Sequence, residues 1–222
     1  MFFSKKKPKG ETLIEVIVAI GVVGLGAITA SGMIISSIRN TAVNKNYLLA
    51  DNLAKEGIEA VKSIRDTNWL RFSYDTENCW DVLNDEEVID TKGDCKKSTK
   101  INNTGTSKFY RVNMNPKNST APFKFKLEEP EEAVDFLPAV NETAASYYLL
   151  EPDAKNLNLY RHTGNPEGVT SKGTSFYRAI GIKNESEDVN KTTRLRVASI
   201  VQWQEGGDFK EIVIDTLLTN YQ

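Results

Sequence analysis

Histidine is almost absent from this chain: of 222 residues, only His162 is a histidine. A single imidazole excludes most histidine-dependent catalysis and His-rich metal sites. The sequence also lacks a Gly-rich phosphate loop, a zinc-ligand spacing and a nucleophile elbow. His162 follows Arg161 in a polar stretch, so we expect its side chain to be exposed rather than catalytic. We therefore predict that the protein is not an enzyme and has no catalytic residue, metal or cofactor.

Positive charge is scarce beyond the first ten residues. The whole chain has 28 basic and 30 acidic residues, a formal net charge of −2. Four lysines and no acidic residue stand in residues 1–10, so residues 11–222 hold 24 basic and 30 acidic residues, a formal charge of −6. A moderately acidic surface binds a phosphate backbone poorly. We therefore expect no nucleic-acid partner.

Long apolar runs are limited to one. Residues 16–38 form a run of 23 residues without a charge, and no second stretch of this kind exists. As a helix this run reaches roughly 35 Å, enough to cross the hydrocarbon core of a bilayer. Because lysines precede it, the positive-inside rule keeps the basic side in the cytoplasm and places the rest of the chain outside. We predict a single-pass protein of the cytoplasmic membrane with an extracytoplasmic carboxyl terminus.

A secretory signal peptide has a similar basic start and apolar run, and Ala30 offers a small residue for its cleavage. The run is long for such a peptide, however. In addition, Glu15 stands at its start, where a carboxylate is costly in lipid. Neither a signal peptide nor a plain anchor has a use for this acid.

The sequence around this acid is KGETLIEVIVAI, residues 9–20. It resembles the amino-terminal processing signal of type IV pilins and pseudopilins, a short basic leader that ends in Gly before an apolar segment whose fifth mature residue is Glu. The resemblance implies that a prepilin peptidase cuts between Gly10 and Glu11 and that the new amino group of Glu11 is methylated. The family usually has Phe or Met at the first mature position, so Glu11 departs from its pattern.

The same resemblance implies an assembly role for Glu15. In a filament the amino-terminal helices pack into a dry core, where a lone carboxylate is costly. In the family this acid compensates the positive terminal amine of a neighbouring subunit. The alternative is a Glu that lies at the lipid headgroups without a partner. The partners implied are other pilin subunits, the prepilin peptidase, a pilus or secretion assembly platform and the membrane.

A helical pattern continues beyond the apolar run. Ala50, Ala54 and Gly57 are small, which allows a sheet to approach closely, and residues 11–70 contain no proline. We expect a leader at 1–10, a transmembrane or filament-core helix at 11–39 and an amphipathic helical half at 40–70. The apolar positions of this half recur at spacings of three and four: 43, 47, 50, 54, 57/58, 61 and 64.

The remaining sequence predicts an α+β pilin fold, in which the long helix packs on a carboxyl-terminal antiparallel sheet. Residues 71–145 are expected to form an irregular, elaborated αβ-loop region with short strands at 109–114 and 123–127. Residues 146–222 are expected to form the sheet of a globular head, with one face on the helix and one in water. Its strands are predicted at 147–151, 157–160, 176–183, 195–203 and 210–218.

Alternation with a period of two also predicts which residues of the last three strands share a face. A turn is expected at 205–208, where two glycines stand together. The residues expected on the shared face are Phe176, Ile180, Ile182, Leu195, Val197, Val201, Trp203, Ile212, Ile214 and Leu218.

The chain has two cysteines, Cys79 and Cys95. An even number in an extracytoplasmic head favours a disulfide, and closing a loop of about 15 residues stabilises by roughly 3 kcal/mol in the chain-entropy model. The alternative is two free thiols, because spacing alone does not bring their Cα atoms together.

Together these features predict a structural subunit of a type IV pilus-like filament. Residues 197–203 and 216–219 are most similar to the minor pilin or pseudopilin branch. We expect a minor or priming subunit that ends in an extracellular or periplasmic filament. Two alternatives are left open. One is a pseudopilin of a type II secretion or DNA-uptake system. The other is a membrane-anchored extracytoplasmic binding protein or enzyme.

Overall fold

The computed structural model describes residues 12–83, 95, 100–101, 107–115, 124–129, 148–152, 160–162, 175–187 and 191–220. The chain forms two compact units, Met1–Lys45 and Asn46–Gln222. We call the second unit the head. Residues 1–11, which contain the predicted leader, lie outside the described residues.

One helix carries most of the first unit and enters the second. Helix α1 (Leu13–Arg71) has 59 residues, with Glu15 in its first turn and Arg71 in its last. Opposite charges at these two ends suit the helix dipole. Helix α1 ends at Arg71, one residue after the predicted end at residue 70. A second helix, α2 (Thr76–Cys79), is a single turn inside the region expected to be irregular.

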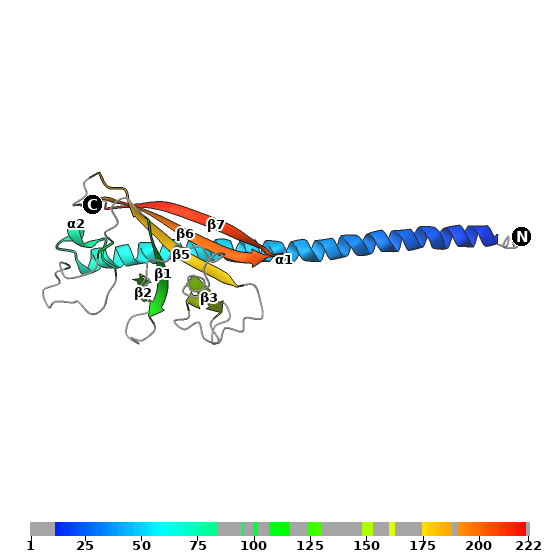
Figure 1. Ribbon diagram of the computed structural model, residues 1–222, viewed down its shortest axis with the longest axis horizontal. Coiled ribbons are helices and arrows are strands. Elements are labelled where there is room, and N and C mark those ends of the chain that lie inside the picture. Colours follow the sequence, from blue (N-terminus) through cyan, green and yellow to red (C-terminus); the bar gives the residue numbers. More distant parts are fainter. Residues whose placement is uncertain are drawn as a thin grey trace, which may run out of the picture. The chain divides into compact units, whose positions relative to one another are not determined.

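The described strands form a seven-stranded antiparallel sheet in the head. Neighbours along the sheet follow the order β2-β1-β5-β3-β4, and β6 pairs with both β5 and β7. In Figure 1, β5, β6 and β7 lie along the cyan part of α1. The strands are β1 (Lys108–Asn115), β2 (Lys124–Glu128), β3 (Leu149–Pro152), β4 (Tyr160–His162), β5 (Phe176–Asn184), β6 (Arg194–Glu205) and β7 (Asp208–Thr219).

The hairpin between β6 and β7 turns at two glycines. Gly206 has φ +64° and Gly207 has φ +97°, a conformation that L side chains rarely adopt, and Glu205 pairs with Asp208 across the turn. Two residues with positive φ match the right-handed twist of the flanking strands. The turn predicted at residues 205–208 is confirmed.

The core lies between the second half of α1 and one face of the sheet. Two clusters line this contact, one around Ile58, Val61 and Ile64 and the other around Leu53 and Ala54. The shared sheet face predicted from the sequence is confirmed. Its residues are buried on β5 and β6, while Ile212 and Ile214 on β7 are half-buried.

The opposite face of the sheet differs from the prediction. We expected water there, but Tyr148 and Ala179 are fully buried and pack with Phe109 and Ile200. A Cβ on Gly181 would lie 3.2 Å from Cε1 of Phe109. The loop-region strand β1 pairs with β5 and brings Phe109 over it, a long-range pairing that no local pattern specifies.

Residues 157–159 of the strand predicted at 157–160 lie outside the described residues. Tyr160 belongs to β4, in which His162 pairs with Leu150 of β3. His162 is therefore part of the sheet, 5% exposed, and the expectation of an exposed histidine is wrong.

Candidate functional sites: the apolar helix segment and the disulfide-bonded turn

The first candidate site is the apolar part of α1. In the described part of the chain, α1 is long and apolar enough to cross a membrane, and its most apolar window is 0% buried. Large apolar side chains between Leu13 and Ile38 are 42–78% exposed. A surface of this kind requires lipid or an apolar partner.

Two hydroxyl groups in this segment bond to carbonyl oxygens of the same helix. Thr29 Oγ1 donates to the carbonyl oxygens of Leu25 and Gly26 at 3.2 and 2.9 Å, and Ser31 Oγ donates to that of Ala27 at 2.8 Å. Because an unpaired hydroxyl is costly in an apolar medium, this internal pairing suits a segment that leaves water. The segment therefore carries these hydrogen bonds into any surroundings.

Glu15 stands at the start of the segment, exposed in the first turn of α1. Its backbone N–H donates to the carbonyl of Thr12 at 2.9 Å, which closes the start of the helix. A carboxylate at this end interacts favourably with the helix dipole. Gly10 and Glu11, the positions of predicted cleavage and methylation, lie outside the described residues.

The second half of α1 packs closely on the sheet at Gly57. A Cβ on this residue would meet Ser199 Oγ and lie 2.7 Å from Ile180 Cδ1, so only a residue without a side chain fits between helix and sheet. Ser199 and Ile180 face each other across β6 and β5. The prediction that Gly57 lets the sheet approach closely is confirmed.

Near this contact, the side chain of Arg178 links the sheet to the helix. Arg178 of β5 donates from Nη1 to the carbonyl oxygen of Leu53 at 3.1 Å and lies 3.2 Å from Oε1 of Glu56. The Arg178 side chain is 2% exposed and that of Glu56 is 34% exposed. Burial lowers the pKa of Arg178, and the Glu56 carboxylate opposes this change. The pair fixes the helix at one position along β5.

The amino-terminal end of the head is joined in a similar way. Asn46 Nδ2 donates to Oε1 of Glu205 at 3.1 Å. The ring of Tyr47 meets that of Trp203 edge to face, with centroids 5.0 Å apart. Such aromatic pairs add stability beyond the area they bury. The end of β6 is thus attached to α1 at the first residues of the head.

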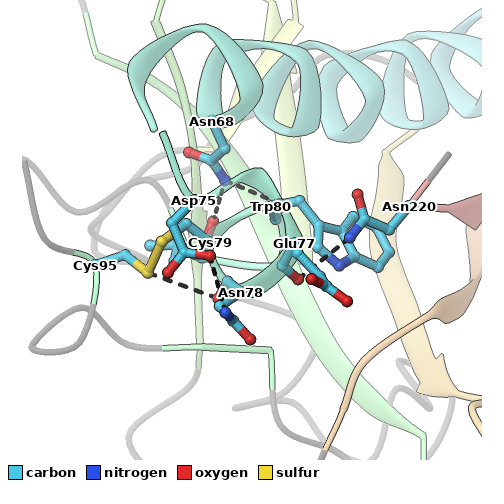
Figure 2. Close-up of a disulfide and its surroundings, with 9 residues drawn as sticks. Asn68, Asp75, Glu77, Asn78, Cys79, Trp80, Cys95 and Asn220 are labelled. Atoms are coloured by element: carbon cyan, nitrogen blue, oxygen red, sulfur yellow. Dashed lines mark hydrogen bonds between the residues drawn. A yellow bond between two sulfur atoms is a disulfide. The ribbon is translucent and has the colours of Figure 1, made fainter. Parts of the chain in front are cut away.

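The second candidate site is the turn that follows α1, residues 72–83. Cys79 and Cys95 form a disulfide with Cα atoms 5.6 Å apart, so the predicted bridge is present. Figure 2 shows Asn68 projecting from α1 toward this turn, where its Nδ2 donates to the carbonyl oxygens of Trp80 and Val82 at 3.1 and 2.7 Å. A buried amide therefore holds the turn against the helix.

The turn also contacts the carboxyl-terminal end of the chain. Trp80 Nε1 donates to the carbonyl oxygen of Thr192 at 2.9 Å. Asn220 Nδ2 donates to the carbonyl oxygen of Glu77 at 3.2 Å (Figure 2). Lys191 forms an ion pair with Glu77. The disulfide-bonded turn thus contacts both α1 and the carboxyl-terminal part of the described chain.

Asp81 is a buried acid of this turn, and it is 4% exposed. Burial raises its pKa, and a hydrogen bond from Thr192 and the charge of Lys100 partly oppose the rise. Over the residues that the structure describes, no three His, Cys, Asp or Glu side chains gather where they could hold a metal ion.

The sequence patterns did not identify Arg178 and Ser199, two polar residues near the contact between Gly57 and the sheet. The sequence nevertheless contained a signal for both positions. On the predicted shared face, position 178 is a gap between Phe176 and Ile180, and position 199 is a gap between Val197 and Val201. A polar residue inside an apolar period of two must find a partner when buried.

No family model, curated protein or solved structure matches this chain. The likeness to pilins therefore depends on the amino-terminal motif at residues 9–20, together with an arrangement of helix and antiparallel sheet that is consistent with the pilin fold.

Proposed function

We propose that this chain is a structural subunit of a type IV pilus-like filament, a minor or priming pilin. Residues 11–39 anchor it in the cytoplasmic membrane, with the head outside, until the subunit enters the filament. The observation that carries the proposal is the division of α1 into a fully exposed apolar segment and a segment packed on the sheet.

The exposed segment suits a subunit that exchanges lipid for protein. Its large apolar side chains need an apolar environment, and either lipid tails or neighbouring helices supply one. Thr29 and Ser31 bond within the helix, so neither hydroxyl needs a new partner after the exchange. The transfer therefore costs these groups little.

Glu15 is the group whose free energy changes when the segment exchanges lipid for neighbouring helices. At the membrane surface its carboxylate is hydrated, whereas inside a bundle of apolar helices an unpaired charge costs several kcal/mol. A positive terminal amine from a neighbouring subunit removes this cost. Assembly therefore depends on the charge of Glu15, while simple anchoring does not.

Mass spectrometry of the mature protein tests processing. We expect an amino terminus at Glu11, and we expect Gly10→Val to leave an uncleaved precursor in the membrane. An intact leader on the wild-type protein, in cells with an active prepilin peptidase, would contradict the proposal. The same spectrum measures methylation of Glu11.

Incorporation of Glu15 variants into sheared filaments tests assembly. Glu15→Ala and the equally sized, uncharged Glu15→Gln should insert and be cleaved normally, yet incorporate at least tenfold less because the amine loses its partner. Glu15→Asp should be intermediate. Glu59→Gln is the matched control, since Glu59 is exposed and pairs only locally with Lys62 at 2.7 Å.

Equal incorporation of Glu15→Gln and wild type would favour a membrane-anchored binding protein instead. A Glu15 effect seen with components of a type II secretion or DNA-uptake machine would favour a pseudopilin. Crosslinking of the wild-type protein and the Glu15 variants, followed by identification of the crosslinked partners, separates these outcomes.

A further inference from the structure

The chain's only histidine lies where a positive charge is poorly accommodated. His162 is buried on β4; its imidazole makes no well-aligned hydrogen bond to the described residues, although the backbone of Leu149 lies close enough to favour its protonation. It pairs across the hairpin with Leu150, which packs with Phe176 in the core beneath α1. Among the described residues, the buried imidazole therefore has no well-aligned acceptor for a second proton.

Two cations approach this imidazole from other strands. Arg178 of β5 is paired with Glu56 of α1, and Arg111 of β1 is paired with Glu128 of β2 at 2.5 Å. Burial, Arg178 and Arg111 lower the pKa of His162 well below its ordinary value, and the backbone of Leu149 opposes this only weakly.

Glu151 of β3 is one residue away from the Leu150–His162 pair in the ladder. By strand alternation its side chain lies on the opposite face from His162. Among the described residues, the neighbouring carboxylates Glu56 and Glu128 are each already engaged by an arginine. A histidinium would add a net positive charge.

Over the residues that the structure describes, the hairpin that carries His162 is joined to the rest of the sheet by few backbone pairs. β4 pairs with β3 at three positions and contacts β1, and β3 pairs with β5 at Leu149 and Leu150. In contrast, β6 pairs with β5 at nine positions and with β7 at twelve. Local opening is cheapest where few backbone hydrogen bonds are lost.

We propose that the β3–β4 hairpin is an acid-sensitive element: uptake of a proton by His162 releases the hairpin from β5, while α1, β5, β6 and β7 stay packed. Release exposes the apolar side chains of Leu150 and Phe176. Above the ordinary histidine pKa, near 6.5, the imidazole is neutral in both states and protonation contributes nothing to opening. Below it, each pH unit favours the open state up to tenfold, until the pKa of the closed state is reached.

The test uses the full chain in detergent micelles, without a histidine tag and with isotope-labelled histidine. Because His162 is the only histidine, one imidazole signal reports its protonation from pH 8 to pH 4. Amide exchange is measured over the same range. We expect protonation well below pH 6.5, accompanied by loss of protection in β3 and β4 and by retained protection in β6 and β7.

Three outcomes of the wild-type titration would overturn the proposal. The first is protonation near pH 6.5 with the hairpin still protected. The second is protonation at any lower pH without loss of protection. The third is loss of protection throughout the head at one pH, which would show global acid unfolding. None of them depends on a variant that must fold.

His162→Gln provides the matched variant, since Gln has hydrogen-bonding groups but gains no charge in this range. Its hairpin should keep its protection at the pH where wild type loses at least tenfold. Glu187→Gln removes a 92% exposed carboxylate paired with Arg194 and should leave the wild-type transition unchanged. Opening of His162→Gln at the wild-type pH would assign the acid response to carboxylates and reject the proposal.

Discussion

Between Leu13 and Ile38, α1 exposes its large apolar side chains, whereas between Ala50 and Ile64 the same helix buries a stripe against the sheet. The glycines mark the difference. A Cβ on Gly24 would meet nothing within 4 Å, while one on Gly57 would meet Ser199 and Ile180. Helical geometry is common to both segments, so the partner of each segment, and not its backbone, distinguishes them.

Polar groups differ between the two segments in the same way. Thr29 and Ser31 bond to carbonyls of their own helix, but Glu56 pairs with Arg178 of β5. The first segment can therefore change its surroundings without losing a hydrogen bond. The second segment is tied to one surface, because its partners belong to the sheet.

Removal of the first segment gives the largest expected change. A fragment that begins at Asn40 should leave the membrane fraction and be a soluble, folded monomer, because the stripe that packs on the sheet is retained. Size-exclusion chromatography and circular dichroism measure this. An unfolded fragment would show that the head depends on residues before Asn40.

Matched valine substitutions should separate the two segments next. Gly57→Val should destabilise the head by about 3 kcal/mol, because the new side chain is forced against Ser199 and Ile180. Gly24→Val should leave head stability unchanged. Denaturation followed by tryptophan fluorescence measures this directly, since all three tryptophans lie in the head. Similar unfolding midpoints for both variants would contradict the close packing of Gly57 against the sheet.

The ion pair between helix and sheet should contribute less. Arg178→Met should cost about 2 kcal/mol, because the carbonyl of Leu53 loses a donor and Glu56 loses its partner. Adding Glu56→Met should cost little more, since the unpaired carboxylate is then gone. Strictly additive losses in denaturant titrations would show that the two side chains are not coupled.

The exposed face of the packed segment should contribute least. Asp51 lies 2.6 Å from Lys55 one turn away, and 62% of the lysine side chain is exposed. Asp51→Asn should therefore cost only about 0.3–0.5 kcal/mol and nothing at high salt. A loss above 1 kcal/mol in the same denaturation assay would indicate that this face is covered.

Much of the fold could be predicted because its signals are local. An uninterrupted apolar run predicted the exposed apolar segment of α1. Apolar positions spaced three and four apart predicted the second half of this helix, and alternation with a period of two predicted strands β5 to β7. The Gly206-Gly207 turn was predicted on equally local grounds, whereas the Cys79–Cys95 bridge was predicted from an even number of cysteines in a head expected outside the cytoplasm. Cleavage at Gly10, methylation of Glu11 and the assembly role of Glu15 remain predictions.

The errors arose where distant segments meet. The outer sheet face was expected in water because its composition alternates, yet β1 brings Phe109 over Gly181. His162 was expected to be exposed because its sequence neighbours are polar, yet β4 pairs with β3 and places it inside. Burial depends on which strands become neighbours, and local composition does not encode that choice.

The sequence by itself determined which segments are helical, which alternate as strands and which one is apolar enough for a membrane, because these properties depend on residues a few positions apart. Only the tertiary structure decided which polar side chains are enclosed. Arg178 meets Glu56 across 122 residues of chain, and His162 meets two arginines from other strands. Burial, and neighbours that chain topology and not sequence proximity brings together, shift the pKa values of both groups.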